Sequence, residues 1–82
     1  MRYISDIPND FFKISLYTWN GKYIAKIEAG PYEQTYKVSE LDFGGTEEDI
    51  RAAFANEAFV ATIAARFRQM HADFQAILAQ ST

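Results

Sequence analysis

Hydrophobic and polar residues alternate on both sides of Asn20-Gly21, from Phe11 to Gly30. An Asn-Gly pair favours a two-residue type I′ turn, because both central positions of that turn need a positive φ. The turn aligns Trp19 with Lys22. A shift of one residue would move every apolar side chain to the opposite face of the sheet. We therefore predict a two-stranded hairpin with an apolar face and a mixed face.

A third strand follows a second turn. The segment Ala29–Tyr32, AGPY, predicts a four-residue loop, after which EQTYKVSEL over 33–41 forms the next strand. This loop places Glu28 opposite Glu33, a like-charge pair that counts against the register. The pattern predicts a three-stranded antiparallel meander over residues 11–41, preceded by an N-terminal segment at 1–10.

The pattern becomes helical after "DFGG" at 42–45, where two glycines interrupt the chain. Thr46 and Asp49 resemble a capping box at the start of a short helix, and Asn56 can cap the next one. From Glu57 to about Gln80 a single apolar stripe continues along the chain. It contains Phe59, Ile63, Phe67, Met70, Phe74 and Ile77.

The long helix is expected to extend past the sheet. A helix of about 24 residues is roughly 36 Å long, whereas strands of eight residues span only ~27 Å. Phe74, Ile77 and Leu78 would then need cover, either from Tyr3, Ile4 and Ile7 or from a second copy of the chain.

The predicted fold class is α+β, with the order β-β-β-α-α and both helices on one face of an antiparallel sheet. Residues 1–82 are expected to form a single domain, with the helical part at 46–80. The predicted core consists of Phe12, Ile14, Leu16, Tyr23, Ala25, Ile27, Tyr36, Val38, Ile50, Phe54, Phe59, Ile63, Phe67, Met70 and Phe74.

Composition narrows the functional classes. The chain has 82 residues, no cysteine and a formal net charge of −3. The acidic balance argues against a general nucleic-acid binder, because such binding depends on Lys and Arg neutralising phosphates. The N-terminus has no apolar core typical of a signal peptide, and no stretch approaches the ~20 apolar residues that span a bilayer. We expect a soluble, cytoplasmic protein without a membrane partner.

No motif indicates catalysis or a cofactor. His71 is the only histidine, and no second ligand lies at helical spacing to complete a metal site. Ser15, Thr35 and Ser39 have no adjacent base. Gly44-Gly45 precedes a helix start that carries three acidic residues, which disfavours a phosphate there. We predict a non-enzymatic protein without cofactor or metal.

The mixed face of the sheet is the candidate binding surface. It contains Lys13, Tyr17, Trp19, Lys22, Ile24, Lys26 and Lys37. Three interpretations remain open: a plain solvent-exposed face, a contact with a protein partner or a second copy, and a nucleic-acid surface where lysines hold phosphates and aromatics stack. The absence of arginine from this face disfavours the last.

The run FKISLYTWNGKYIAKIEAGPYEQTYKVSELD, residues 12–42, resembles stretches in small bacterial proteins of unknown function. The resemblance implies a free-standing bacterial domain and brings no function with it. The expected function is a small interaction protein that self-associates, as a homodimer. The alternatives are a nucleic-acid-binding module and a regulatory or small-ligand-binding domain.

Overall fold

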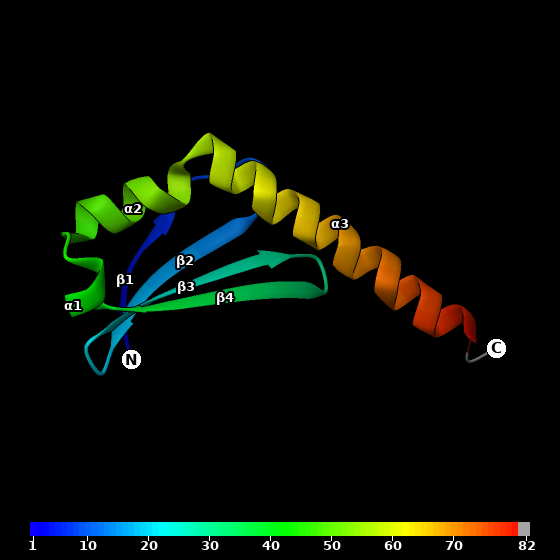
Figure 1. The fold of residues 1–82 in the computed structure, drawn as a ribbon, viewed down its shortest axis with the longest axis horizontal. Coiled ribbons are helices and arrows are strands. Elements are labelled where there is room, and N and C mark those ends of the chain that lie inside the picture. The colour runs from blue at the N-terminus through cyan, green and yellow to red at the C-terminus, as the bar shows by residue number, and fades with distance from the viewer. Residues whose placement is uncertain (81–82) are drawn as a thin grey trace.

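The computed structural model describes residues 1–80, which form one sheet and three helices (Figure 1). In chain order the elements are β1 (Arg2–Ile7), β2 (Lys13–Trp19), β3 (Lys22–Ala29), β4 (Tyr32–Ser39), α1 (Glu40–Phe43), α2 (Glu47–Ala55) and α3 (Glu57–Gln80). The sheet is antiparallel with the order β1-β2-β3-β4. Helices α2 and α3 lie over one of its faces. The α+β class is confirmed, but the sheet has four strands rather than three.

The extra strand, β1, comes from the segment that the sequence left outside the meander. It pairs with β2, and the pairing shifts between Tyr3 and Ser5, so that Ile4 forms a bulge. A bulge inserts one residue and breaks the alternation of period two. Because of this break, the apolar residues of β1 do not show a strand pattern, although Ile7 pairs with Ile14 on the core face.

The β2–β3 hairpin has the predicted register, with Trp19 opposite Lys22. Asn20 and Gly21 have φ values of 54° and 74°, as a type I′ turn requires. The β3–β4 register is also confirmed, since Glu28 pairs with Glu33. The second turn is tighter than predicted, because the ladder extends to Ala29 and Tyr32.

The chain leaves the sheet earlier than predicted. Strand β4 ends at Ser39, and the short helix α1, which the sequence did not indicate, begins at Glu40. The Glu40 amide donates a 2.9 Å hydrogen bond to the Gly21 carbonyl, and this bond holds α1 against the Asn20-Gly21 turn. Helix α1 ends at Gly44, whose φ of 71° is the left-handed conformation common after helices.

The predicted helix signals are confirmed. The Thr46 side chain accepts a hydrogen bond from the Asp49 amide, and the Asp49 carboxylate accepts one from the Thr46 amide. Asn56 separates α2 from α3, and its side chain accepts a hydrogen bond from the Phe59 amide at 3.1 Å. These caps satisfy backbone donors that a helix start leaves without intrahelical partners.

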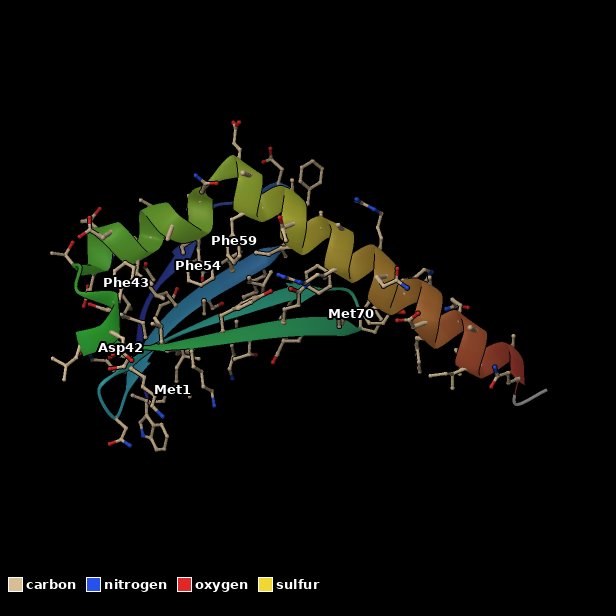
Figure 2. All side chains as sticks on the ribbon, in the orientation of Figure 1. Met1, Asp42, Phe43, Phe54, Phe59 and Met70 are labelled. Atoms are coloured by element: carbon tan, nitrogen blue, oxygen red, sulfur yellow. The ribbon has the colours of Figure 1, made fainter. Side chains whose placement is uncertain are left out.

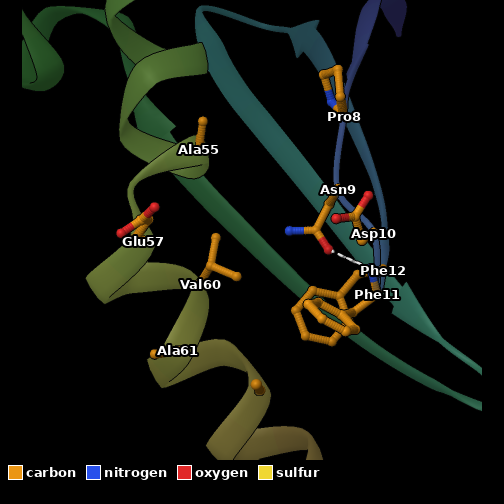
Figure 3. A pocket seen from close by; sticks show the side chains of 10 residues that line it. Pro8, Asn9, Asp10, Phe11, Phe12, Ala55, Glu57, Val60 and Ala61 are labelled. Carbon is orange, nitrogen blue, oxygen red and sulfur yellow. Dashed lines mark hydrogen bonds between the residues drawn. The ribbon is translucent and has the colours of Figure 1, made fainter.

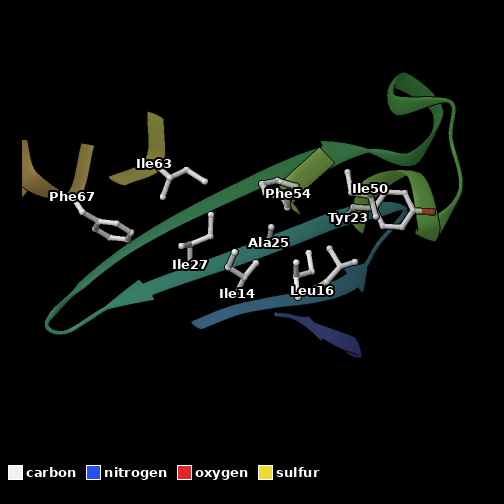
Figure 4. Close-up of a cluster of buried hydrophobic side chains, with 10 residues drawn as sticks. Ile14, Leu16, Tyr23, Ala25, Ile27, Ile50, Phe54, Ile63 and Phe67 are labelled. Atoms are coloured by element: carbon white, nitrogen blue, oxygen red, sulfur yellow. The ribbon is translucent and has the colours of Figure 1, made fainter. Parts of the chain in front are cut away.

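The hydrophobic core lies between the sheet and the helices (Figure 4). Its buried members are Ile7, Ile14, Leu16, Tyr23, Ala25, Ile27, Ile50, Phe54, Ile63 and Phe67. Most of the predicted core is therefore confirmed, either buried or, as for Tyr36 and Phe59, partly buried against it. Figure 2 shows Phe43, Phe54 and Phe59 pointing into the same space.

Phe74 was wrongly assigned to the core. Its side chain is 44% exposed, because α3 continues beyond the end of the sheet and contributes to a molecule of 48 × 26 × 20 Å (Figure 1). The N-terminal segment does not cover this overhang, since β1 lies on the far side of the sheet. Tyr32 contacts Phe74, with ring centroids 6.2 Å apart. Ile77 is exposed.

Candidate interaction surface

The face of the sheet opposite the helices has no other described element over it (Figure 1). We call it the open face. The strand register arranges its side chains in four rows across the sheet. From the Asn20-Gly21 turn onward, the rows are Trp19–Lys22–Ser39, Tyr3–Tyr17–Ile24–Lys37, Asp6–Ser15–Lys26–Thr35 and Lys13–Glu28–Glu33.

All seven predicted surface residues lie on the open face, but Ile24 is not exposed. Its exposed fraction is 1%, although no helix covers it. Ile24 lies on an inner strand, with Tyr17 opposite it on β2 and Lys37 on β4. Side chains directly across strands are close enough to touch, and lysine stems can cover apolar surface while their ammonium groups stay in water. Ile24 is therefore an anchor beneath this surface rather than a contact residue.

The aromatic residues of the open face lie around Ile24. Trp19 is 54% exposed at the end of β2. Tyr3 and Tyr17 form an edge-to-face pair with ring centroids 5.7 Å apart. Tyr3 was missed by the sequence analysis, because the bulge at Ile4 hides which face it occupies. Its hydrogen bond to Asp6 raises the pKa of the Tyr3 phenol above its ordinary value.

All four lysines of the chain lie on the open face, whereas none of the four arginines does. The ion pairs within residues 1–80 involve arginines: Arg2 contacts Glu47, and Arg51 contacts Glu47 and Glu48. The lysine ammonium groups of the described residues therefore have no carboxylate partner within 4.0 Å. Lys26 instead lies over the Tyr17 ring, with Nζ 5.4 Å from its centroid.

Charge on the open face is divided between its ends. The two rows nearest the Asn20-Gly21 turn contain Lys22 and Lys37 and no acidic residue. The acidic residues Asp6, Glu28 and Glu33 lie in the other two rows. We call the surface formed by Tyr3, Tyr17, Trp19, Lys22, Lys26 and Lys37 the basic-aromatic patch. Its residues lie in the two rows nearest the turn, apart from Lys26, which lies in the adjoining row that also contains Asp6.

A separate hollow lies between the β1–β2 loop and the joint of α2 and α3 (Figure 3). Phe11, Phe12 and Val60 are among the residues that line it. The Asn9 side chain accepts hydrogen bonds from the Phe11 and Phe12 amides, at 2.8 and 3.0 Å, and so shapes the loop. A ligand site normally combines apolar walls with convergent polar groups. Here the side-chain oxygen of Asn9 already accepts hydrogen bonds from the loop backbone, so it is not available to orient a ligand.

Other candidate chemistry stays dispersed. His71 is exposed on α3, where its Nδ1 shares a 2.9 Å hydrogen bond with the Tyr32 hydroxyl. Residues 1–80 contain no cluster of three or more His, Asp or Glu side chains suited to a metal ion. None of the helices in that range combines the length and apolar character needed to cross a membrane.

Comparisons with protein-family models, with curated proteins and with solved structures find no match to this chain.

Proposed function

We propose that this protein is a non-enzymatic interaction protein that binds an acidic segment of another protein on the basic-aromatic patch. The observation that carries the proposal is the gathering of all four lysines on one uncovered sheet face, none with a carboxylate partner in the described residues. Long-range attraction between opposite charges speeds and orients encounter. Exposed Trp and Tyr then provide the contact area that interface cores favour.

The rigidity of the basic-aromatic patch supports the proposal. The patch is built on paired strands, and Ile24 anchors it from below. A preformed surface loses little conformational freedom when a partner binds, so more of the contact energy appears as affinity. The acidic residues of α2, Glu47, Glu48 and Asp49, lie in the helical layer and do not share the open face.

A second candidate, single-stranded nucleic acid, is favoured by one observation. The patch combines exposed aromatic rings with lysines on a flat sheet, an arrangement on which bases stack while cations neutralise phosphates. The patch has no arginine, the residue that makes the commonest contact to bases. We therefore rank this candidate second.

Self-association is the other part of the proposal. The structure leaves apolar side chains on the α3 overhang uncovered, and both outer strands of the sheet have only one strand neighbour. Uncovered apolar groups and unpaired strand edges are the features through which copies of a small protein associate.

Trp19 makes the binding proposal directly measurable, because it is the only tryptophan in the chain. Titration with a synthetic peptide of alternating Glu and Leu should shift Trp19 emission and saturate. The Lys22→Glu/Lys26→Glu double variant should lose this binding at least tenfold. Arg68→Glu, on exposed α3, is the matched control and should bind as the wild type does.

An oligothymidylate titration in parallel separates the two candidates. Tighter binding of the oligonucleotide, with affinity falling steeply as salt rises, would favour nucleic acid over an acidic peptide. The binding proposal fails if neither probe changes Trp19 emission at low salt.

A further inference from the structure

The two edges of the sheet differ in how they are protected. The β1 edge contains the bulge at Ile4. It is also held by α2, because Arg51 donates a 3.0 Å hydrogen bond to the Ser5 hydroxyl and Arg2 pairs with Glu47. Bulges and covering elements are devices that prevent strand edges from pairing. The β1 edge is therefore closed to a further strand.

The β4 edge has no bulge. Helix α3 does contact this strand, since Gln34 donates a 3.1 Å hydrogen bond to the Ile63 carbonyl and Arg66 donates a 3.0 Å hydrogen bond to the Tyr36 hydroxyl. The two edges therefore differ in the regularity of the strand.

The pairing of β4 with β3 runs without interruption from Tyr32 to Ser39, and the strand contains no proline. Within residues 1–80 no strand lies on its outer side, and in Figure 1 it is the exposed margin of the sheet. A regular eight-residue strand with a free row of backbone groups is a template for another strand.

The charges of β4 are complementary to themselves. Glu33 and Lys37 are its only charged residues, and both point to the open face, two positions on either side of Thr35. If two copies of β4 pair antiparallel with Thr35 opposite Thr35, each Glu33 lies opposite Lys37 of the other copy. Opposite charges directly across strands stabilise a pair.

Other registers are penalised by the same two residues. A slip of two residues keeps each side chain on its own face but places Glu33 and Lys37 opposite uncharged residues, so both opposite-charge pairs are lost. A slip of four residues places Glu33 opposite Glu33 or Lys37 opposite Lys37, and like charges directly opposite destabilise a sheet. A lysine on an edge normally deters pairing, but with Glu33 on the same edge it favours the register centred on Thr35.

Within the described residues Glu33 accepts a 2.8 Å hydrogen bond from the Thr35 hydroxyl but has no cationic partner. Its neighbour on β3 is Glu28, so a like-charge pair lies within the sheet. Lys37 makes no ion pair within the described residues. Pairing through β4 would extend this row from Lys13, Glu28 and Glu33 to Lys37 of the second copy, which offsets the repulsion.

The helical layer beside β4 combines apolar and charged side chains. An apolar hollow lined by Val38, Phe43 and Phe54 runs between β4 and the helices. The flank of α3 above this edge carries Arg66 and Asp73 beside Thr35. Both side chains have partners within the chain, since Arg66 donates a hydrogen bond to the Tyr36 hydroxyl and Asp73 accepts one from Gln69.

We infer that the partner in self-association is a second copy that pairs edge to edge through β4, centred on Thr35, and forms a continuous eight-stranded sheet. This inference rests on the proposed self-association and names its surface. The two-fold axis of this dimer would place both sets of helices on one side. The two open faces would then form a single surface with eight lysines.

A charge swap tests the inference by light scattering after size-exclusion chromatography. Wild-type protein should elute at twice the 9.4 kDa of one chain. Glu33→Lys alone and Lys37→Glu alone should each be monomeric, because each creates two like-charge pairs. An equimolar mixture of these variants should recover a dimer, and native mass spectrometry should show one copy of each. The Glu33→Lys/Lys37→Glu double variant should dimerise by itself.

A control variant removes apolar side chains from the α3 overhang, which is the alternative surface for self-association. Phe74→Ser/Ile77→Ser, on the exposed overhang, should leave the dimer intact, and circular dichroism verifies that every variant is folded. A wild type that stays monomeric at millimolar concentration overturns both self-association and the β4 edge. A dimer that tolerates the charge changes but is lost in the overhang variant retains self-association and overturns the β4 edge.

Discussion

The side chain of Asp49 shows how one residue organises a helix start. Its carboxylate accepts a 2.8 Å hydrogen bond from the Thr46 amide and a 3.1 Å bond from the Thr46 hydroxyl. The backbone hydrogen bond, followed by the hydroxyl, lowers the pKa of Asp49 from its ordinary value of 3.8. The ionised carboxylate is therefore favoured in the folded chain.

The lowered pKa of Asp49 predicts an acid-dependent loss of stability. A depressed carboxyl pKa contributes stability that is present above the unfolded pKa and is lost as pH falls through the folded pKa. The window therefore begins near pH 3.8 and extends below it. Asp49→Asn should show a smaller fall in the free energy of unfolding across this window than the wild type. Urea denaturation at pH 3 and pH 6 measures it, and equal falls in both proteins would contradict the prediction.

Helix α3 combines two environments along one apolar stripe. Ile63 is fully buried against the sheet, whereas Phe74 lies past the sheet end. The spacing of the stripe is helical throughout, so periodicity alone assigns both residues to the core. Only the length of the sheet beneath the helix separates them.

Truncation of these two residues should therefore have unequal effects. Ile63→Ala should lower the free energy of unfolding by about 2–5 kcal/mol, because it leaves a cavity in packed surroundings. Phe74→Ala should change it by less than about 1 kcal/mol, since the side chain is already partly in water. Chemical denaturation of both variants at low protein concentration tests this. Similar losses would mean that the overhang is packed as tightly as the core.

At the scale of the whole molecule, the sheet has one covered face, one open face and two unlike edges. The lysines gather on the open face, while most acidic residues belong to α1, α2 and the loops. This separation lets an acidic chain, with a net charge of −3, present a basic patch at the turn-side end of the open face. Net charge by itself therefore does not show the charge of this part of the surface.

The unlike edges predict a concentration-dependent pattern of amide exchange. Outward amides of β4 should exchange more slowly at high protein concentration, because a second copy occupies them, whereas β1 should show no such change. Hydrogen exchange read by mass spectrometry at micromolar and millimolar concentrations measures the difference. Exchange in β4 that does not depend on concentration would contradict edge pairing.

Local rules were sufficient for much of the fold. The type I′ turn at Asn20-Gly21, the β2–β3 register and the capping box at Thr46 depend on residues close together in the chain. Backbone sterics and short-range hydrogen bonds decide such features, so they can be read from sequence. Strand β1 was not predicted, because its bulge at Ile4 breaks the alternation of apolar and polar residues by which a strand is identified in a sequence.

The candidate surface was predictable in membership but not in detail. Alternation assigned Trp19 and the lysines to the second face, since a strand points successive side chains to opposite sides. It could not reveal that Ile24 is covered by its neighbours, or that Tyr3 joins the face from an added strand. Both facts depend on which strands lie side by side.

The sequence by itself determined the Asn20-Gly21 turn, the caps, the β2–β3–β4 register and the apolar stripe of α3, because each follows from interactions within a few residues or across one turn. Only the tertiary structure decided that β1 completes the sheet, that one face stays open, that α3 overhangs, and that β4 is the edge strand without a bulge. These properties depend on distances between segments far apart in the chain, and no local pattern encodes what covers a surface.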